Sequence, residues 1–138
     1  MGKSIIAMQI AHHAAKHGHC AASFSLEMTK EALVRRLISA LARVDAQRLR
    51  SGTLNAEERL RACRAASEIE NLPLWIDDSR ARTIPAVTAA LRKLCARQVI
   101  RLVLIDHLQL MKCTGRAESR HQELSEISHC LKHLAGEL

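Results

Sequence analysis

The sequence predicts an α/β protein in which a parallel sheet is flanked by helices. Short apolar segments alternate along the chain with longer segments whose apolar residues recur every three or four positions. The short segments lie at 20–26, 74–77 and 100–106. Strands that are apolar at successive positions are typical of a sheet covered on both faces, and alternation with helices is typical of parallel pairing.

The first helix and the first strand follow directly from the N-terminal sequence. An almost wholly apolar run begins after Ser4 and fits a helix lying on a sheet, and it ends at Lys16-His17-Gly18. Cations suit the last turn of a helix and glycine suits the residue after it. Residues 20–26 then form a buried strand that ends at Glu27.

The middle of the chain is predicted to form three helices. Thr29 caps the first of them, whose inward face is apolar, and a short helix follows at 45–51. Asn55 and Glu58 have the spacing of a capping box and begin a charged helix that runs to about residue 70.

The last third of the chain repeats the alternation. A brief strand at 74–77 precedes a helix that Thr83 caps, with Pro85 in its first turn. Residues 100–106 are apolar on both faces and predict a central parallel strand. The final helix carries an apolar stripe made of Leu124, Ile127, Leu131, Leu134 and Leu138.

Composition narrows the class of protein. The 138 residues form one domain or part of one, and the net charge of +7 suits a polyanionic partner such as nucleic acid. Phe24 and Trp75 are the two aromatic residues, which argues against a binder that relies on base stacking. Five scattered cysteines without a C-x-x-C pair indicate reduced thiols. Without a signal peptide or a long apolar run, we expect a cytoplasmic protein with no membrane partner.

The chain opens with Gly2-Lys3-Ser4, which matches the end of the phosphate-binding loop G-x-x-x-x-G-K-[ST]. In such a loop, backbone N–H groups hold a di- or triphosphate, the lysine reaches the terminal phosphates and the hydroxyl binds Mg²⁺. Three residues are a weak signal by themselves, because the upstream glycine and the strand before the loop are not in the sequence.

Two acids follow apolar strands directly and strengthen this interpretation. Glu27 ends the first predicted strand and Asp106 ends the last. Ligands of open parallel sheets bind beyond the carboxyl ends of the strands, so both acids are expected near Ser4. An acid after four apolar residues is typical of a Mg²⁺ ligand, and a separate glutamate can act on the attacking water. Alternatively, Asp106 ends a strand and Glu27 begins a solvated loop, with no chemical role for either.

A series of sequence blocks runs along the chain in a characteristic order. The blocks are Gly2-Lys3-Ser4, Phe24-Ser25-Leu26-Glu27-Met28, residues 49–54, residues 76–78, Leu104-Ile105-Asp106-His107-Leu108-Gln109-Leu110-Met111, residues 120–128 and residues 131–135. Together they resemble the RecA-like motor domain of bacterial replicative DNA helicases, the DnaB-like family, and the resemblance covers essentially the whole chain.

The resemblance implies a RecA-like P-loop NTPase core and a ring-shaped homo-hexamer that couples hydrolysis of ATP with Mg²⁺ to movement on single-stranded DNA. By position, Gly2, Lys3 and Ser4 bind the nucleotide, and Ser4 and Asp106 bind Mg²⁺. Lys3 and Glu27 serve catalysis, with Glu27 as the base. Arg116 and Arg120 correspond to a region that lies near the central channel in this family. Two interpretations of these arginines stay open: they contact DNA, or they belong to a solvated loop.

The chain departs from the family pattern in ways that shape what we expect of it. His107 stands where tyrosine is usual, Ser119 where asparagine is usual and His129 where arginine is common. The family also has a sensor strand, a DNA-binding loop, an arginine finger and an N-terminal domain, and none of the blocks of this sequence corresponds to these parts. We therefore expect residues 1–138 to be a single partial domain, truncated at both ends, with an unpaired apolar sheet edge and little activity alone. The alternative is a non-catalytic remnant that binds full-length helicase subunits or DNA.

Overall fold

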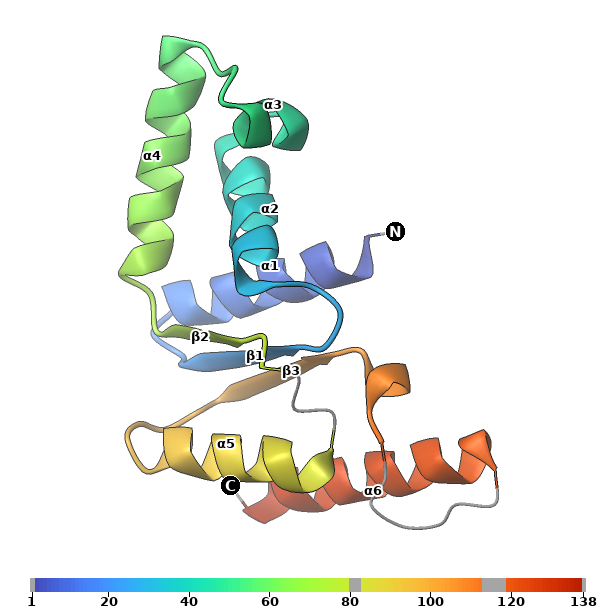
Figure 1. Cartoon of the computed structure of the whole chain (residues 1–138). Helices are drawn as coiled ribbons and strands as arrows, with labels where there is room; N and C mark the ends of the chain where they lie inside the picture. Colours follow the sequence, from blue (N-terminus) through green and yellow to red (C-terminus); the bar gives the residue numbers. More distant parts are fainter. Residues whose placement is uncertain (1, 80–82, 113–118, 138) are drawn as a thin grey trace.

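The computed structural model describes residues 2–79, 83–112 and 119–137, and it confirms the predicted α/β class (Figure 1). Helices and strands alternate along most of the chain. Their bounds are α1 Lys3–Lys16, β1 Ala21–Ser25, α2 Lys30–Ala42, α3 Ala46–Ser51, α4 Ala56–Glu70, β2 Leu74–Asp77, α5 Ile84–Cys95, β3 Leu102–Asp106, the 3-10 turn η1 Leu108–Leu110 and α6 Arg120–Glu137.

The sheet has three parallel strands in the described residues, in the order β2-β1-β3. Helices α1 and α2 lie on one side of it, and α5 and α6 lie on the other (Figure 1). All five residues of β1 are buried. The sheet is therefore the middle layer of three, as expected for strands that are apolar at successive positions.

The prediction that the last strand is central is wrong for this sheet. The middle position belongs to β1, and β3 pairs with β1 along one side only among the described residues. Val103 at the middle of β3 is 37% exposed. An apolar strand shows that helices cover its faces, but this pattern carries no information on how many neighbouring strands it has.

Local capping follows the sequence at two of the three predicted sites. The side chain of Thr29 accepts a hydrogen bond from the N–H of Ala32 at 3.3 Å, and Asn55 and Glu58 form a complete capping box. Thr83 occupies the N-cap position of α5, but its side chain makes no capping hydrogen bond. The backbone of Thr83 instead bridges to Lys112.

Three apolar cores lie in the described part of the chain. The first lies below the sheet between β1, α5 and α6, and it includes Phe24, Val87, Met111 and Ile127. The second lies between α1, α2 and the sheet and consists of Met8, Leu33 and Leu37. The third lies inside an arm formed by α2, α3 and α4, which stands away from the sheet (Figure 1). Ile127 and Leu134 are the buried members of the predicted stripe on α6, and Leu138 lies outside the described residues.

A charged cluster joins the first helix to this arm. The ammonium of Lys16 donates a hydrogen bond of 2.8 Å to the Glu68 carboxylate of α4. His12 is buried, and its Nε2 lies 3.2 Å from the same carboxylate oxygen. The hydrogen bond from Lys16 holds the pKa of Glu68 below its usual range, and His12 adds to this effect.

Replacing Glu68 with glutamine is expected to lower the free energy of unfolding at pH 7 by no more than about 1 kcal/mol, because the pair is partly exposed. A carboxylate whose pKa is lowered by folding stabilises the protein above its unfolded pKa. The difference between wild type and E68Q should therefore shrink as the pH falls below the usual glutamate pKa of 4.5. Urea titrations at pH 7 and pH 3.5 measure it. An equal or larger loss for E70Q, an exposed acid on the same helix, would contradict this assignment.

Candidate nucleotide-binding site

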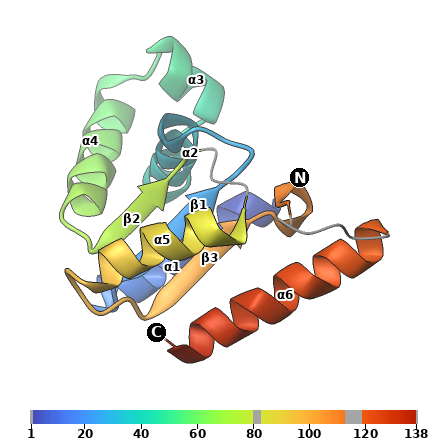
Figure 2. The same ribbon diagram turned by 60° about the horizontal axis from the view of Figure 1, so that its bottom comes forward.

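The elements that carry the predicted site residues have their relevant ends on one side of the molecule. The carboxyl ends of β1 and β3 and the N-terminal end of α1 lie on the same side of the molecule (Figure 1). Figure 2 shows the molecule from another direction, with α1 behind the sheet and α5 in front of it. The shared side of these ends follows from the topology, because α1 runs antiparallel to the strands and covers β1 and β3.

The start of α1 offers donor groups and carries no acid. Gly2 is the N-cap and has no side chain to fill that position, and the first turn contains no acidic residue. The first helical hydrogen bond runs from the N–H of Ile6 to the Gly2 carbonyl at 3.1 Å. The N–H groups of Lys3, Ser4 and Ile5 therefore have no carbonyl partner within the helix, and they lie at its positive end.

The two acids are placed by the pairing of β1 with β3. Ser25 lies opposite Asp106 in the parallel register, and the N–H of Leu26 donates to the Asp106 carbonyl at 2.8 Å. Beyond Ser25 the chain turns, and the Ser25 hydroxyl donates to the Met28 carbonyl at 2.7 Å. Glu27 lies in this turn with its side chain 60% exposed, whereas Asp106 is half-buried.

The structure places His107 next to Glu27, a contact that the sequence alone does not establish. Nδ1 of His107 lies 3.4 Å from the Glu27 carboxylate. The position of His107 in the sequence gives a partial indication of this contact. His107 directly follows Asp106, which ends β3, and the parallel pairing of β3 with β1 brings it to the same edge as Glu27.

The donor set suits a magnesium nucleotide. The edge combines backbone N–H groups at a helix N-terminus, the exposed ammonium of Lys3, the hydroxyl of Ser4 and the carboxylates of Glu27 and Asp106. Phosphate oxygens accept from the first two kinds of group, and Mg²⁺ prefers oxygen ligands of the last two kinds. The residues present therefore fit both parts of such a ligand.

Of the two arginines predicted to contact DNA, the structure describes Arg120. Arg116 lies outside the described residues. Arg120 begins α6, pairs with Glu123 and donates to the carbonyls of Gln109 and Met111. Its guanidinium thereby joins α6 to the turn after β3, and contact with DNA stays a prediction for both residues.

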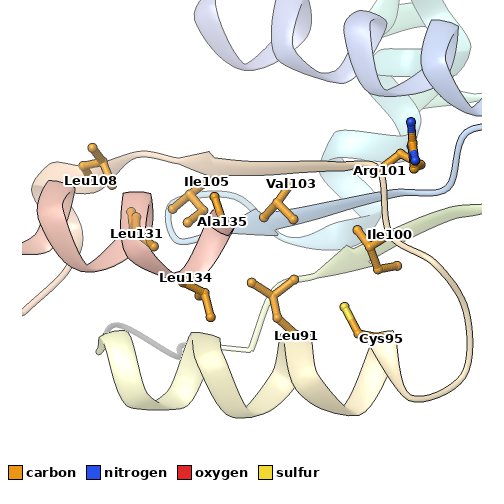
Figure 3. Close-up of a pocket in the computed structure, with 10 residues that line it drawn as sticks. All are labelled: Leu91, Cys95, Ile100, Arg101, Val103, Ile105, Leu108, Leu131, Leu134 and Ala135. Carbon is orange, nitrogen blue, oxygen red and sulfur yellow. The ribbon is translucent and has the colours of Figure 1, made fainter. Parts of the chain in front are cut away.

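An apolar groove runs beside β3 on the side of α5 and α6 (Figure 3). Its volume is about 420 Å³. The side chains of Val103 and Ile105 from β3 face it, together with Leu91 from α5 and Leu131 from α6.

In the described part of the chain, no helix is both long enough and apolar enough to span a bilayer.

Comparison with known proteins gives a consistent result. The sequence model of the family described as DnaB-like helicase C terminal domain matches residues 1–138. The replicative DNA helicase DnaB of Leifsonia xyli subsp. xyli is 42% identical over 139 residues, which cover 100% of this chain and 30% of the relative. The corresponding protein of Geobacillus stearothermophilus is 38% identical over 140 residues, which cover 100% of this chain and 31% of the relative.

Solved structures agree with these sequence relatives. One solved ATPase domain superposes with a TM-score of 0.91 at 27% identity, covering 99% of this chain and 49% of that chain. A DnaB-like replicative helicase, solved in a study of its interactions with primase, also gives a TM-score of 0.91, at 28% identity, and the match covers 99% of this chain and 34% of that chain. The chain spans 30% of the length of the Leifsonia xyli relative and 31% of the length of the Geobacillus stearothermophilus relative. It belongs to the family of DnaB-like helicase C-terminal domains.

Proposed function

We propose that the chain is the nucleotide-binding part of the motor domain of a replicative DNA helicase, which couples ATP hydrolysis to movement on single-stranded DNA and to duplex unwinding. The observation that carries the proposal is that the start of α1 lies on the same side of the molecule as the carboxyl ends of β1 and β3, which Glu27 follows and Asp106 ends. Family membership supports it, and the basic net charge of +7 suits a DNA partner. The homo-hexameric ring is part of the same proposal.

In this proposal each residue has one task. The N–H groups at the start of α1 and the ammonium of Lys3 bind the phosphates, and Ser4 and Asp106 hold Mg²⁺. The metal neutralises charge on the phosphates when bound. Glu27 accepts a proton from the attacking water, for which its exposure to solvent is suitable.

Nucleotide binding tests the first task. Replacing Lys3 with alanine is expected to weaken binding of a fluorescent ATP analogue with Mg²⁺ by about 10- to 100-fold, the effect of losing one charge-assisted hydrogen bond worth about 1.5–3 kcal/mol. K132A removes the same charge from an exposed position on α6 and should leave the affinity unchanged. The proposal fails if folded wild-type protein and K3A bind the nucleotide equally, or if neither binds it.

Hydrolysis and unwinding are tested in a chimera. The 138 residues replace the matching segment of the Geobacillus stearothermophilus relative, which aligns with the whole of this chain. We expect DNA-stimulated ATP hydrolysis and unwinding by the chimera, and loss of both in its K3A variant. A chimera that forms the ring of its parent but hydrolyses no ATP would contradict the catalytic proposal.

A second candidate function is non-catalytic binding to full-length helicase subunits. The observation that favours it is the apolar groove beside β3 together with the exposed Val103 on that strand (Figure 3). Size-exclusion chromatography of the 138-residue chain mixed with an intact replicative helicase separates the two candidates. Co-elution that V103K abolishes, with no nucleotide binding by the chain, supports the second candidate over the first.

A further inference from the structure

We infer that His107 is a positioning residue for Glu27, donating its Nδ1–H to the glutamate carboxylate. The effect of this contact on ATP hydrolysis rests on the proposed function, in which Glu27 is the base. The inference goes beyond that proposal by assigning a role to a side chain that the proposal leaves without one.

The contact is built by two neighbouring strands. Nδ1 of His107 lies 3.4 Å from Oε2 of Glu27. Glu27 follows β1 and His107 follows β3, and the hydrogen bond of 2.8 Å from the Leu26 N–H to the Asp106 carbonyl ties the two strand ends together immediately before them. The two side chains therefore leave the same edge of the sheet side by side.

The two partners differ in how firmly they are held. The Glu27 side chain is 60% exposed, and that of His107 is 33% exposed. A glutamate has three side-chain torsions and loses much rotamer freedom when fixed, whereas the histidine ring has two. A general base acts only when it lies within hydrogen-bond reach of the proton it accepts. The more buried ring thus restricts the orientation of the more mobile acid.

This role requires one particular form of the ring. Neutral imidazole carries one hydrogen, and the hydrogen bonds around the ring decide which nitrogen holds it. A carboxylate only accepts, so a hydrogen bond to Glu27 places that hydrogen on Nδ1. Free histidine in water prefers the hydrogen on Nε2, and the tautomer of His107 therefore reports the contact.

Nitrogen-detected NMR of the 138-residue chain at about pH 9, where histidine is neutral, tests the tautomer. His107 is expected to carry its hydrogen on Nδ1 in wild type and to change to the Nε2–H form in E27A. E27Q keeps an acceptor oxygen and should keep the Nδ1–H form. His17, whose Nδ1 lies 2.8 Å from the His13 carbonyl, is the internal reference and should not change in either variant. An Nε2–H form in wild type, or no change in E27A, overturns the inference.

Kinetics in the chimera test the consequence. H107A is expected to lower kcat roughly 10- to 100-fold with little change in the KM for ATP, because the base is misplaced while the nucleotide still binds. H107N should restore most of kcat, since its side-chain amide nitrogen lies close to the position of Nδ1. Equal rates for wild type and H107A overturn the positioning role. An inactive parent chimera counts against the proposed function instead, and the tautomer measurement then decides the contact by itself.

Discussion

Truncating Phe24 to alanine is expected to lower the free energy of unfolding by about 3–5 kcal/mol, the cost of removing a large aromatic side chain from a packed core. Phe24 is 1% exposed and lies on β1, the middle strand of the sheet. Domains of this size are stable by only about 5–15 kcal/mol, so the loss would be a large fraction of the total. Urea denaturation followed by far-ultraviolet circular dichroism measures it.

The matched control is L60A, which also removes a large apolar side chain. Leu60 on α4 is 53% exposed, so its truncation leaves no cavity and should change the free energy of unfolding by no more than about 0.5 kcal/mol. If F24A and L60A cost the same, Phe24 does not lie in a packed core.

Most of the fold is predictable from sequence because the signals for its elements are local. The capping box at Asn55 and Glu58 depends on a spacing of three residues, and the structure forms it as predicted. The position of β3 in the sheet depends on pairing with residues about 80 positions away, and an apolar pattern is silent about such partners. Thr83 shows a related limit, because its backbone bridges to Lys112 in place of the expected cap.

The sequence predicts at which edge of the sheet the candidate site lies, but not the contacts within it. Acids that end parallel strands meet at one edge, which places Glu27 and Asp106 together from sequence alone. The contact of His107 with Glu27 is not predictable in this way, since it also depends on the register of two strands and on two side-chain rotamers. Likewise, no local pattern indicates that Arg120 donates to backbone carbonyls of the turn after β3.

Replacing Glu27 with glutamine is expected to lower ATP hydrolysis by the chimera about 10²- to 10⁴-fold, the range for removing a general base. Glutamine has nearly the same shape and keeps an acceptor oxygen, so the turn at Ser25 and the contact with His107 should persist. Binding of the nucleotide should change little, because Lys3 and the start of α1 supply the phosphate contacts in the proposed site. Single-turnover hydrolysis and equilibrium binding, measured on the same preparations, separate the two effects.

The control for this experiment is E31Q, which neutralises an exposed acid in the first turn of α2, a short distance further along the chain. It changes the net charge by the same amount and should leave hydrolysis within about twofold of the parent chimera, as expected for an exposed position outside the site. Full hydrolysis by E27Q would remove Glu27 from the reaction. Parallel losses of binding and hydrolysis would make it a ligand of the bound nucleotide, because a residue that acts only in the transition state lowers kcat without weakening the ground-state complex.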